Sequence, residues 1–152
     1  MSEHRIVRTS TCRAPVEVAF EYVADYRKIP EWLLGVERFE PVGDQTRGPG
    51  AVFDVTVRFG LGLHARVQAV EWVENEVIGI DSLEGPGVRS RWHFTRTGPD
   101  ETTVRADVTY RLPFGPAGMA MARMMQPFVH QAVAFASSSL VRKVEAAAGA
   151  QR

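Results

Sequence analysis

The chain has 152 residues, 45% of them hydrophobic and 24% charged, which is enough apolar material for one packed core and enough charge for a soluble surface. We therefore expect a single domain over residues 1–152. Its 18 basic and 18 acidic residues cancel, so the composition gives no global attraction for phosphate backbones and no reason to expect nucleic acid as a partner.

The first part of the chain predicts a strand followed by two short helices. Residues 4–12 are rich in Ile, Val and Thr, which favours a strand. Apolar residues then recur at helical spacing behind a proline that suits a first helical turn, so we expect a helix over 15–24. A second helical piece is expected over 26–34, with Asp25 capping its start and Gly35 ending it.

The middle of the chain changes to a period of two, which is typical of strands. Apolar residues alternate with polar ones between clusters of turn-forming residues. The strands expected on this pattern cover residues 36–42, 51–59, 63–74, 77–83, 88–96 and 102–112. Short connections imply antiparallel pairing, and the alternation implies a sheet with one apolar face and one wet face.

A long helix is expected at the end of the chain, over residues 115–148, because apolar residues recur there at three- and four-residue steps. A helix of about 30 residues is about 45 Å long, which is enough to cover the apolar face of the sheet. Pro127 lies inside this segment and cannot donate to the carbonyl of Arg123, so we expect a kink there.

Residues 14–33, APVEVAFEYVADYRKIPEWL, carry the pattern that is most specific to a family. The matching residues are Ala14, Pro15, Val23, Ala24, Asp25, Pro30 and Trp32. The stretch resembles the start of the polyketide cyclase/dehydrase and lipid-transport family, within the START and Bet v 1-like (SRPBCC) superfamily. AVEWVE around Trp72 and VTYRLPFGP before the last helix are also similar, so the resemblance covers nearly the whole chain.

The resemblance implies an α+β helix-grip fold, in which a curved seven-stranded antiparallel sheet wraps around a long C-terminal helix, with two short helices between strands 1 and 2. It also implies a cavity between sheet and helix that holds an apolar or amphipathic small molecule. We therefore expect binding or carriage of a lipid, quinone or polyketide-like molecule. The alternative is a polyketide aromatase/cyclase or dehydratase that acts in the same cavity, and fold alone does not decide between them.

Candidate ligand-binding residues come from the apolar strand faces and from both helical regions. They have a second interpretation as a solid core, but small members such as Ala65 and Ser90 would leave volume for a ligand. Methionines of the long helix suit a lining because unbranched thioethers repack around different shapes. The candidates are Trp32, Phe53, Val55, Val57, Phe59, Ala65, Val67, Ile80, Ser90, Trp92, Tyr110, Met121, Met125 and Val129.

Few residues suggest catalysis. The sequence lacks a glycine-rich phosphate loop, a GxSxG nucleophile motif and an HExxH zinc motif. His130 and Tyr110 are the candidate acid or base groups, and each has a structural alternative. We therefore favour a protein that is not an enzyme, with no metal and no nucleotide cofactor in either case.

The cellular location follows from cysteine use and from the N-terminus. The lone Cys12 cannot form an internal disulfide, and no Cys/His cluster has metal-ligand spacing. The N-terminal residues are charged where a signal peptide needs an apolar run, and no run of 18 apolar residues occurs. We expect a cytoplasmic monomer or homodimer without integral membrane contact.

Overall fold

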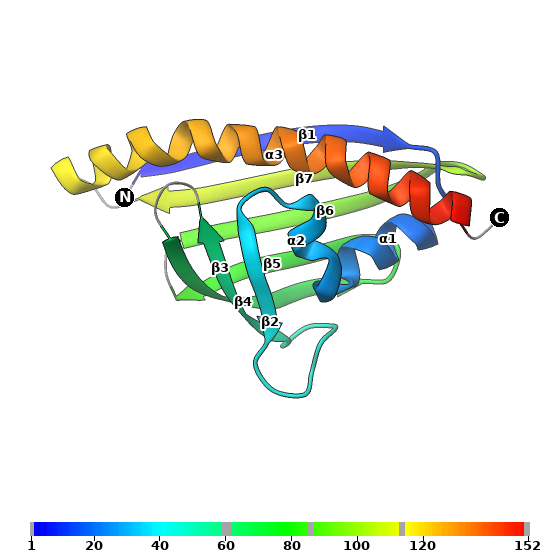
Figure 1. Cartoon of the computed structure of the whole chain (residues 1–152), viewed down its shortest axis with the longest axis horizontal. Helices are drawn as coiled ribbons and strands as arrows, with labels where there is room; N and C mark the ends of the chain where they lie inside the picture. Colours follow the sequence, from blue (N-terminus) through cyan, green and yellow to red (C-terminus); the bar gives the residue numbers. More distant parts are fainter. Residues whose placement is uncertain (1, 59–61, 85–86, 113–114, 151–152) are drawn as a thin grey trace.

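The computed structural model describes residues 2–58, 62–84, 87–112 and 115–150. Within these residues a seven-stranded antiparallel sheet faces a long C-terminal helix, as the helix-grip resemblance implied (Figure 1). The strands are β1 (Ser2–Cys12), β2 (Val36–Pro41), β3 (Val52–Arg58), β4 (Gly62–Val73), β5 (Val77–Glu84), β6 (Gly87–Gly98) and β7 (Glu101–Leu112). The helices are α1 (Val16–Ala24), the 3-10 turn η1 (Tyr26–Lys28), α2 (Ile29–Trp32) and α3 (Pro116–Ala150).

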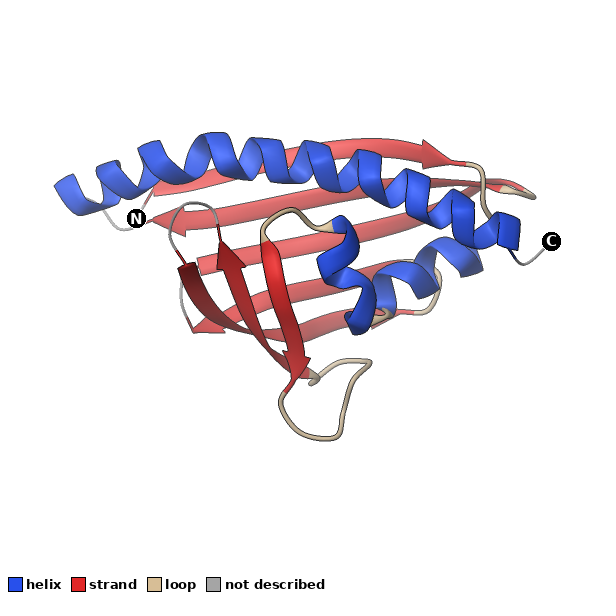
Figure 2. Ribbon diagram, in the orientation of Figure 1, coloured by secondary structure: helices blue, strands red, loops and turns tan. Residues whose placement is uncertain are grey.

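The strand order is β1-β7-β6-β5-β4-β3-β2, so β1 and β2 lie at opposite edges of the sheet. Strands β2 to β7 pair with their neighbours in the chain, and β1 pairs with the last strand. The short helices connect the two edges across one face of the sheet, beside α3 (Figure 2). Because α3 packs on β1 and β7 and also contacts α1 and α2, all the described helices cover the same face.

The junction between α1 and β2 differs from the single helix expected over 26–34. Asp25 caps the start of the helical segment as predicted, because its carboxylate accepts a hydrogen bond from the backbone N–H of Arg27 at 3.1 Å. The chain then forms η1 and the four-residue α2, with Pro30 in the first turn of α2. Leu33 is already extended, and Gly35 has a φ of +85°, so the helical segment ends two residues earlier than predicted.

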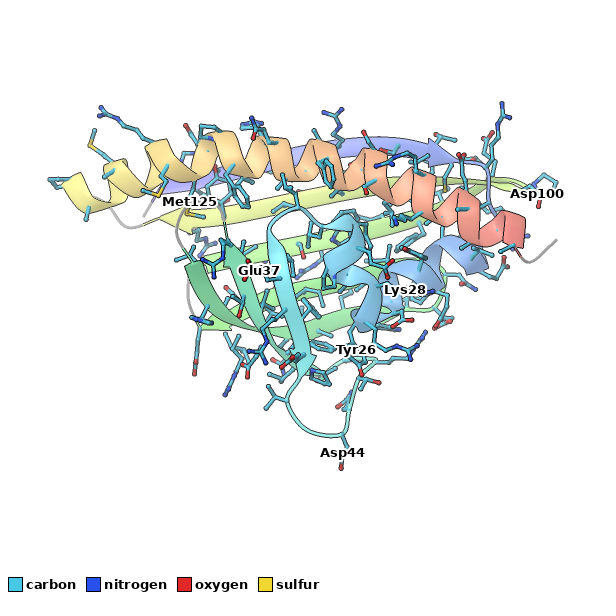
Figure 3. All side chains as sticks on the ribbon, viewed as in Figure 1. Tyr26, Lys28, Glu37, Asp44, Asp100 and Met125 are labelled. Carbon is cyan, nitrogen blue, oxygen red and sulfur yellow. The ribbon has the colours of Figure 1, made fainter. Side chains whose placement is uncertain are left out.

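Helix α3 is one continuous helix through Pro127. The kink expected at that residue stays a prediction. Met125, two residues before Pro127, lies on the side of α3 that faces the strands and is buried (Figure 3). No helix of the described residues is long and apolar enough to cross a membrane.

A bulge in β4 changes which residues face the helices. Ala69 pairs with Ile80 and Glu71 pairs with Gly79, so Val70 is an extra residue with no partner in the ladder. The bulge resets the alternation, and Trp72 therefore faces the same side as Ala69 although it lies three positions further along the chain. The ring of Trp72 packs edge-on against Phe20 of α1, with ring centroids 5.9 Å apart.

The solid part of the core lies under α1 and the second half of α3. Phe20 packs on Phe94 with ring centroids 5.3 Å apart, and Leu140 and Val144 of α3 are buried in the same cluster. Thr102 connects β7 to the segment before α1, since its buried hydroxyl donates to the carbonyl oxygen of Ala14 at 2.7 Å. Side chains of this cluster therefore fill the space beneath the second half of α3.

Candidate ligand-binding site

Two adjoining hollows lie between the sheet, α2 and the first half of α3, as the described residues define them. We call the one beside α2 the inner chamber, with a volume of about 90 Å³, and the one beneath α3 the outer chamber, with a volume of about 240 Å³. The chambers share the lining residues Leu33, Phe39, Ile80 and Ser90. The chambers therefore adjoin at these four side chains, and we refer to the two together as the two-chamber cavity.

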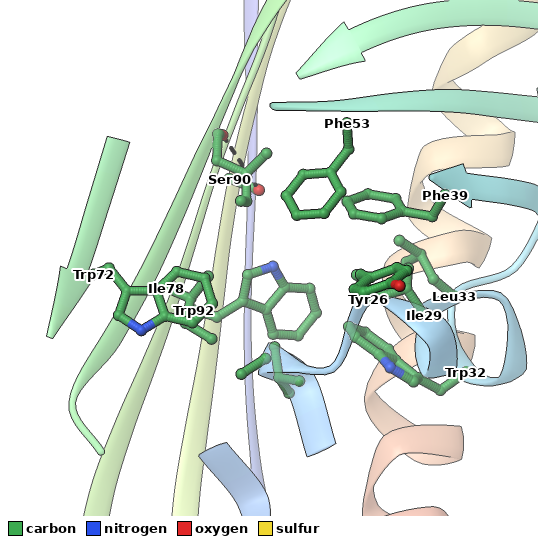
Figure 4. A pocket seen from close by; sticks show the side chains of 13 residues that line it. Tyr26, Ile29, Trp32, Leu33, Phe39, Phe53, Trp72, Ile78, Ser90 and Trp92 are labelled. Carbon is green, nitrogen blue, oxygen red and sulfur yellow. Dashed lines mark hydrogen bonds between the residues drawn. The ribbon is translucent and has the colours of Figure 1, made fainter. Parts of the chain in front are cut away.

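Aromatic rings from the sheet and from the short helices build the inner chamber (Figure 4). Phe53 of β3 packs against Phe39 of β2 at 4.8 Å and against Tyr26 of η1 at 5.9 Å between ring centroids. Trp32 of α2 meets Trp92 of β6 at 5.2 Å with an angle of 82° between the rings, which is the favourable edge-to-face arrangement. These contacts fix the orientation of the rings before any ligand enters.

Aliphatic side chains build the outer chamber. β3 and β4 contribute alternate residues, which point to one face because the side-chain period of a strand is two. Val55 pairs with Ala65 across the two strands, and the short alanine leaves space in front of the valine. Met125, Phe128 and Val129 close the chamber from α3 at the i, i+3 and i+4 positions of one helical stripe.

Polar groups are few in this lining. Among the described residues, neither chamber is lined by an Asp, Glu, Lys, Arg or His side chain. The hydroxyl of Ser90 makes a long contact of 3.4 Å with the carbonyl oxygen of Ile80, and the hydroxyl of Ser82 accepts from the backbone N–H of Val88 at 2.8 Å. An ionised group placed here would lose its hydration without gaining a counter-charge, so the cavity suits an uncharged molecule.

The indole N–H of Trp32 is an exception to the usual pairing of buried donors. It is fully buried and has no hydrogen-bond partner among the described residues. Leaving such a donor unpaired costs about 1–3 kcal/mol. Trp32, a candidate ligand-binding residue with a second interpretation as core, is 2% exposed and also lines the inner chamber, and its contact with a ligand stays a prediction.

Most of the candidate residues line the cavity. Trp32, Phe53 and Trp92 line the inner chamber. Val55, Val57, Ala65, Val67, Met125 and Val129 line the outer chamber. Ile80 and Ser90 line both. Phe59 lies outside the described residues, and Met121 belongs to α3 but its side chain is not described.

The two catalytic candidates lie outside the lining of both chambers. Tyr110 is 2% exposed, stacks on His4 with ring centroids 5.0 Å apart and packs beside Met125. Burial raises the pKa of Tyr110, which makes its phenol a weaker acid than usual. His130 is exposed on α3. The structure therefore does not bring these two groups together at the cavity, and their catalytic roles stay predictions.

Several lining residues escaped the sequence analysis. Phe39 alternates with Arg38 and Glu40, so the period of β2 contained the signal that it faces inward. Phe128 belongs to the helical stripe of Met125 and was identifiable from that spacing. The inward orientation of Trp72 was not predictable from simple alternation, because the bulge in β4 shifts the pattern by one residue.

A curved antiparallel sheet that holds a long helix over an apolar cavity defines the helix-grip class of START and Bet v 1-like proteins. The chain matches the family described as polyketide cyclase/dehydrase and lipid transport over residues 3–145, and it belongs to that family. No curated protein sequence gives a match to the chain.

Solved structures agree on the fold. The Zhui aromatase/cyclase from Streptomyces sp. R1128 superposes with a TM-score of 0.83 at 13% identity, covering 95% of this chain and 94% of that one. Norcoclaurine synthase from Thalictrum flavum, in complex with dopamine and hydroxybenzaldehyde, gives 0.69 at 16% identity, covering 94% and 87%. Ara h 8.0201 gives 0.68 at 17% identity, covering 94% and 98%. At these identities the similarity shows the fold alone.

Proposed function

We propose that residues 1–152 form one domain that binds or carries a hydrophobic small molecule, such as a lipid, quinone or polyketide-like compound, in the two-chamber cavity. The observation that carries this proposal is the outer chamber of about 240 Å³, whose walls are almost entirely apolar. Burial of apolar surface there would contribute about 25 cal/mol for each Å² removed from water. Small-molecule sites usually measure roughly 300–1,000 Å³, so this cavity suits a ligand at the small end of that range.

A polyketide aromatase/cyclase or dehydratase is the second candidate. The family description and the similarity to the Zhui aromatase/cyclase favour it. Catalysis would require a polar group at the ligand, and the described lining offers the phenol of Tyr26 and the hydroxyls of Ser82 and Ser90. If His130 or Tyr110 performs the chemistry, His130→Ala or Tyr110→Phe should abolish turnover of a poly-β-ketone while the fold stays intact. Unchanged cyclisation in both variants would remove those two roles.

The proposal extends to the setting of the protein. A monomer or homodimer in the cytoplasm, with a small molecule as its partner and no cofactor, fits the single cysteine and the balanced charge.

Extraction of the purified protein with organic solvent, followed by mass spectrometry, tests the binding proposal. We expect an apolar molecule in the extract of the wild type and much less of it in that of Ala65→Phe, because a phenyl ring at this position fills the outer chamber. His64→Phe is the matched control, since the neighbouring position in β4 faces the solvent side and is exposed. An empty extract from the wild type, or equal loading of wild type and Ala65→Phe, would contradict the proposal.

A further inference from the structure

We propose that the ligand is uncharged and carries a hydrogen-bond acceptor oxygen, such as a ketone or quinone carbonyl, which binds between the indole N–H of Trp92 and the hydroxyl of Ser90. This inference rests on the proposed function and specifies the chemistry of the ligand and the residues that select it.

Trp92 supplies the first donor. Its side chain comes from the middle of β6, lines the inner chamber and is 7% exposed. Figure 4 shows its ring nitrogen on the edge that points toward Ser90 and Phe53. The described residues supply no acceptor to this N–H, and the edge-to-face contact with Trp32 holds the ring in place. Among the described residues, the fully buried N–H without a partner is that of Trp32, whereas the N–H of Trp92 faces the open volume of the chamber, where a ligand or a water can accept its hydrogen bond.

Ser90 supplies the second donor. It precedes Trp92 by two residues on the same strand, so both side chains point to the same face. Its hydroxyl is committed only to the 3.4 Å contact with the carbonyl of Ile80, which is beyond the usual length of an O–H···O bond. Rotation of that hydroxyl would let it donate to a ligand oxygen. Since Ser90 lines both chambers, the donor pair lies where a ligand held in the outer chamber reaches the inner one.

The charge of the lining selects among acceptors. A carboxylate would accept the same two hydrogen bonds, but no cationic side chain lines either chamber within the described residues. Two neutral donors do not replace the hydration of a full negative charge. A carbonyl oxygen, which needs only one or two donors, matches the site.

Three probes that share one two-ring skeleton test the inference by isothermal titration calorimetry: tetralin, α-tetralone and 1,2,3,4-tetrahydro-1-naphthoate. We expect the wild type to bind α-tetralone about five- to tenfold more tightly than tetralin, as one or two net hydrogen bonds allow, and to bind the carboxylate more weakly than tetralin. Trp92→Phe should reduce the preference for the ketone to about twofold or less, and this ratio compares two ligands in the same variant, so a general change in affinity cancels. Ser90→Ala should reduce the preference in part.

Trp72→Phe is the matched control. It makes the same chemical change at a residue that also lines the inner chamber, but Figure 4 shows its ring nitrogen on the edge that faces away from Phe53. The preference for α-tetralone should therefore survive in this variant.

A wild-type measurement complements the variants in case Trp92→Phe does not fold. The three tryptophans give three indole N–H signals in a proton–nitrogen correlation spectrum. The signal of Trp92 should move downfield on addition of α-tetralone but not of tetralin. If α-tetralone and tetralin bind equally well, or the Trp92 signal responds to both alike, the inference is wrong while the binding proposal stands. If none of the probes binds, the binding proposal fails and the inference fails with it.

Discussion

Replacing Gly35 by alanine should destabilise the protein by about 2–5 kcal/mol. The φ of +85° at this residue lies in the left-handed region, where a residue with a Cβ loses about 1–2 kcal/mol. The added Cβ would also lie 2.8 Å from Cζ of Phe128 and 3.0 Å from the carbonyl oxygen of Arg58. Contacts this short force the phenyl ring or the backbone to move, which costs about 1–3 kcal/mol in a packed region.

Gly43→Ala separates the two contributions. Gly43 also has a positive φ, of +99°, but an added Cβ there would meet nothing within 4 Å. This control should lose only the conformational part, about 1–2 kcal/mol. Urea unfolding followed by circular dichroism measures both variants, and the midpoints are comparable as long as the slope with denaturant is unchanged.

Equal destabilisation of the two variants would refute the reasoning, because it would mean that Phe128 does not press against Gly35. The position of α3 over the junction between α2 and β2 would then be wrong. That junction matters for function, since Phe128 also lines the outer chamber. We therefore also expect Gly35→Ala, but not Gly43→Ala, to weaken the binding of tetralin.

Three further predictions concern the framework around the cavity. Burial raises the pKa of Cys12 to about 11, so its thiol should react with a disulfide reagent only after unfolding, and rapid reaction of the native protein would contradict its placement. Thr102→Val should cost about 1–3 kcal/mol in urea unfolding because the buried carbonyl of Ala14 loses its donor, whereas a loss below about 0.5 kcal/mol would mean that another donor replaces it. The hydrogen bond from Arg5 lowers the pKa of Asp107 below its ordinary value of 3.8, so this stabilisation is present above that pH and is lost as the pH falls through the lower folded value. The difference in melting temperature between wild type and Asp107→Asn should therefore shrink in acid, and a difference that stays constant from about pH 7 to about pH 2 would oppose this.

The sequence predicted the architecture well where periodicity alone decides it. Alternation placed Val55, Ala65 and Val67 on one face, and the helical stripe placed Met125 and Val129 opposite them, because side-chain direction follows directly from strand and helix geometry. Alternation does not reveal a bulge, so only the structure showed that the side chain of Trp72 faces the helices.

The site was less predictable than the fold. Tyr110 shares its strand face with residues that approach the cavity, yet it packs under α3 against His4 and Met125 instead. Whether an inward-facing residue lines open volume depends on how completely the neighbouring side chains fill the space in front of it. The periodicity of the sequence gives no information on this packing. The exposure of His130 similarly depends on the rotation of α3 over the sheet, which only tertiary packing sets.

A crystal structure with 1-bromonaphthalene tests the central claim, that the space between the sheet and α3 is the ligand site, because anomalous scattering places the bromine directly. We predict one bound molecule in the outer chamber, in contact with Val55 of the sheet and Val129 of α3, with its far edge toward Ser90. Bromine found only on the outer surface, with the cavity collapsed or filled by protein side chains, would contradict the account.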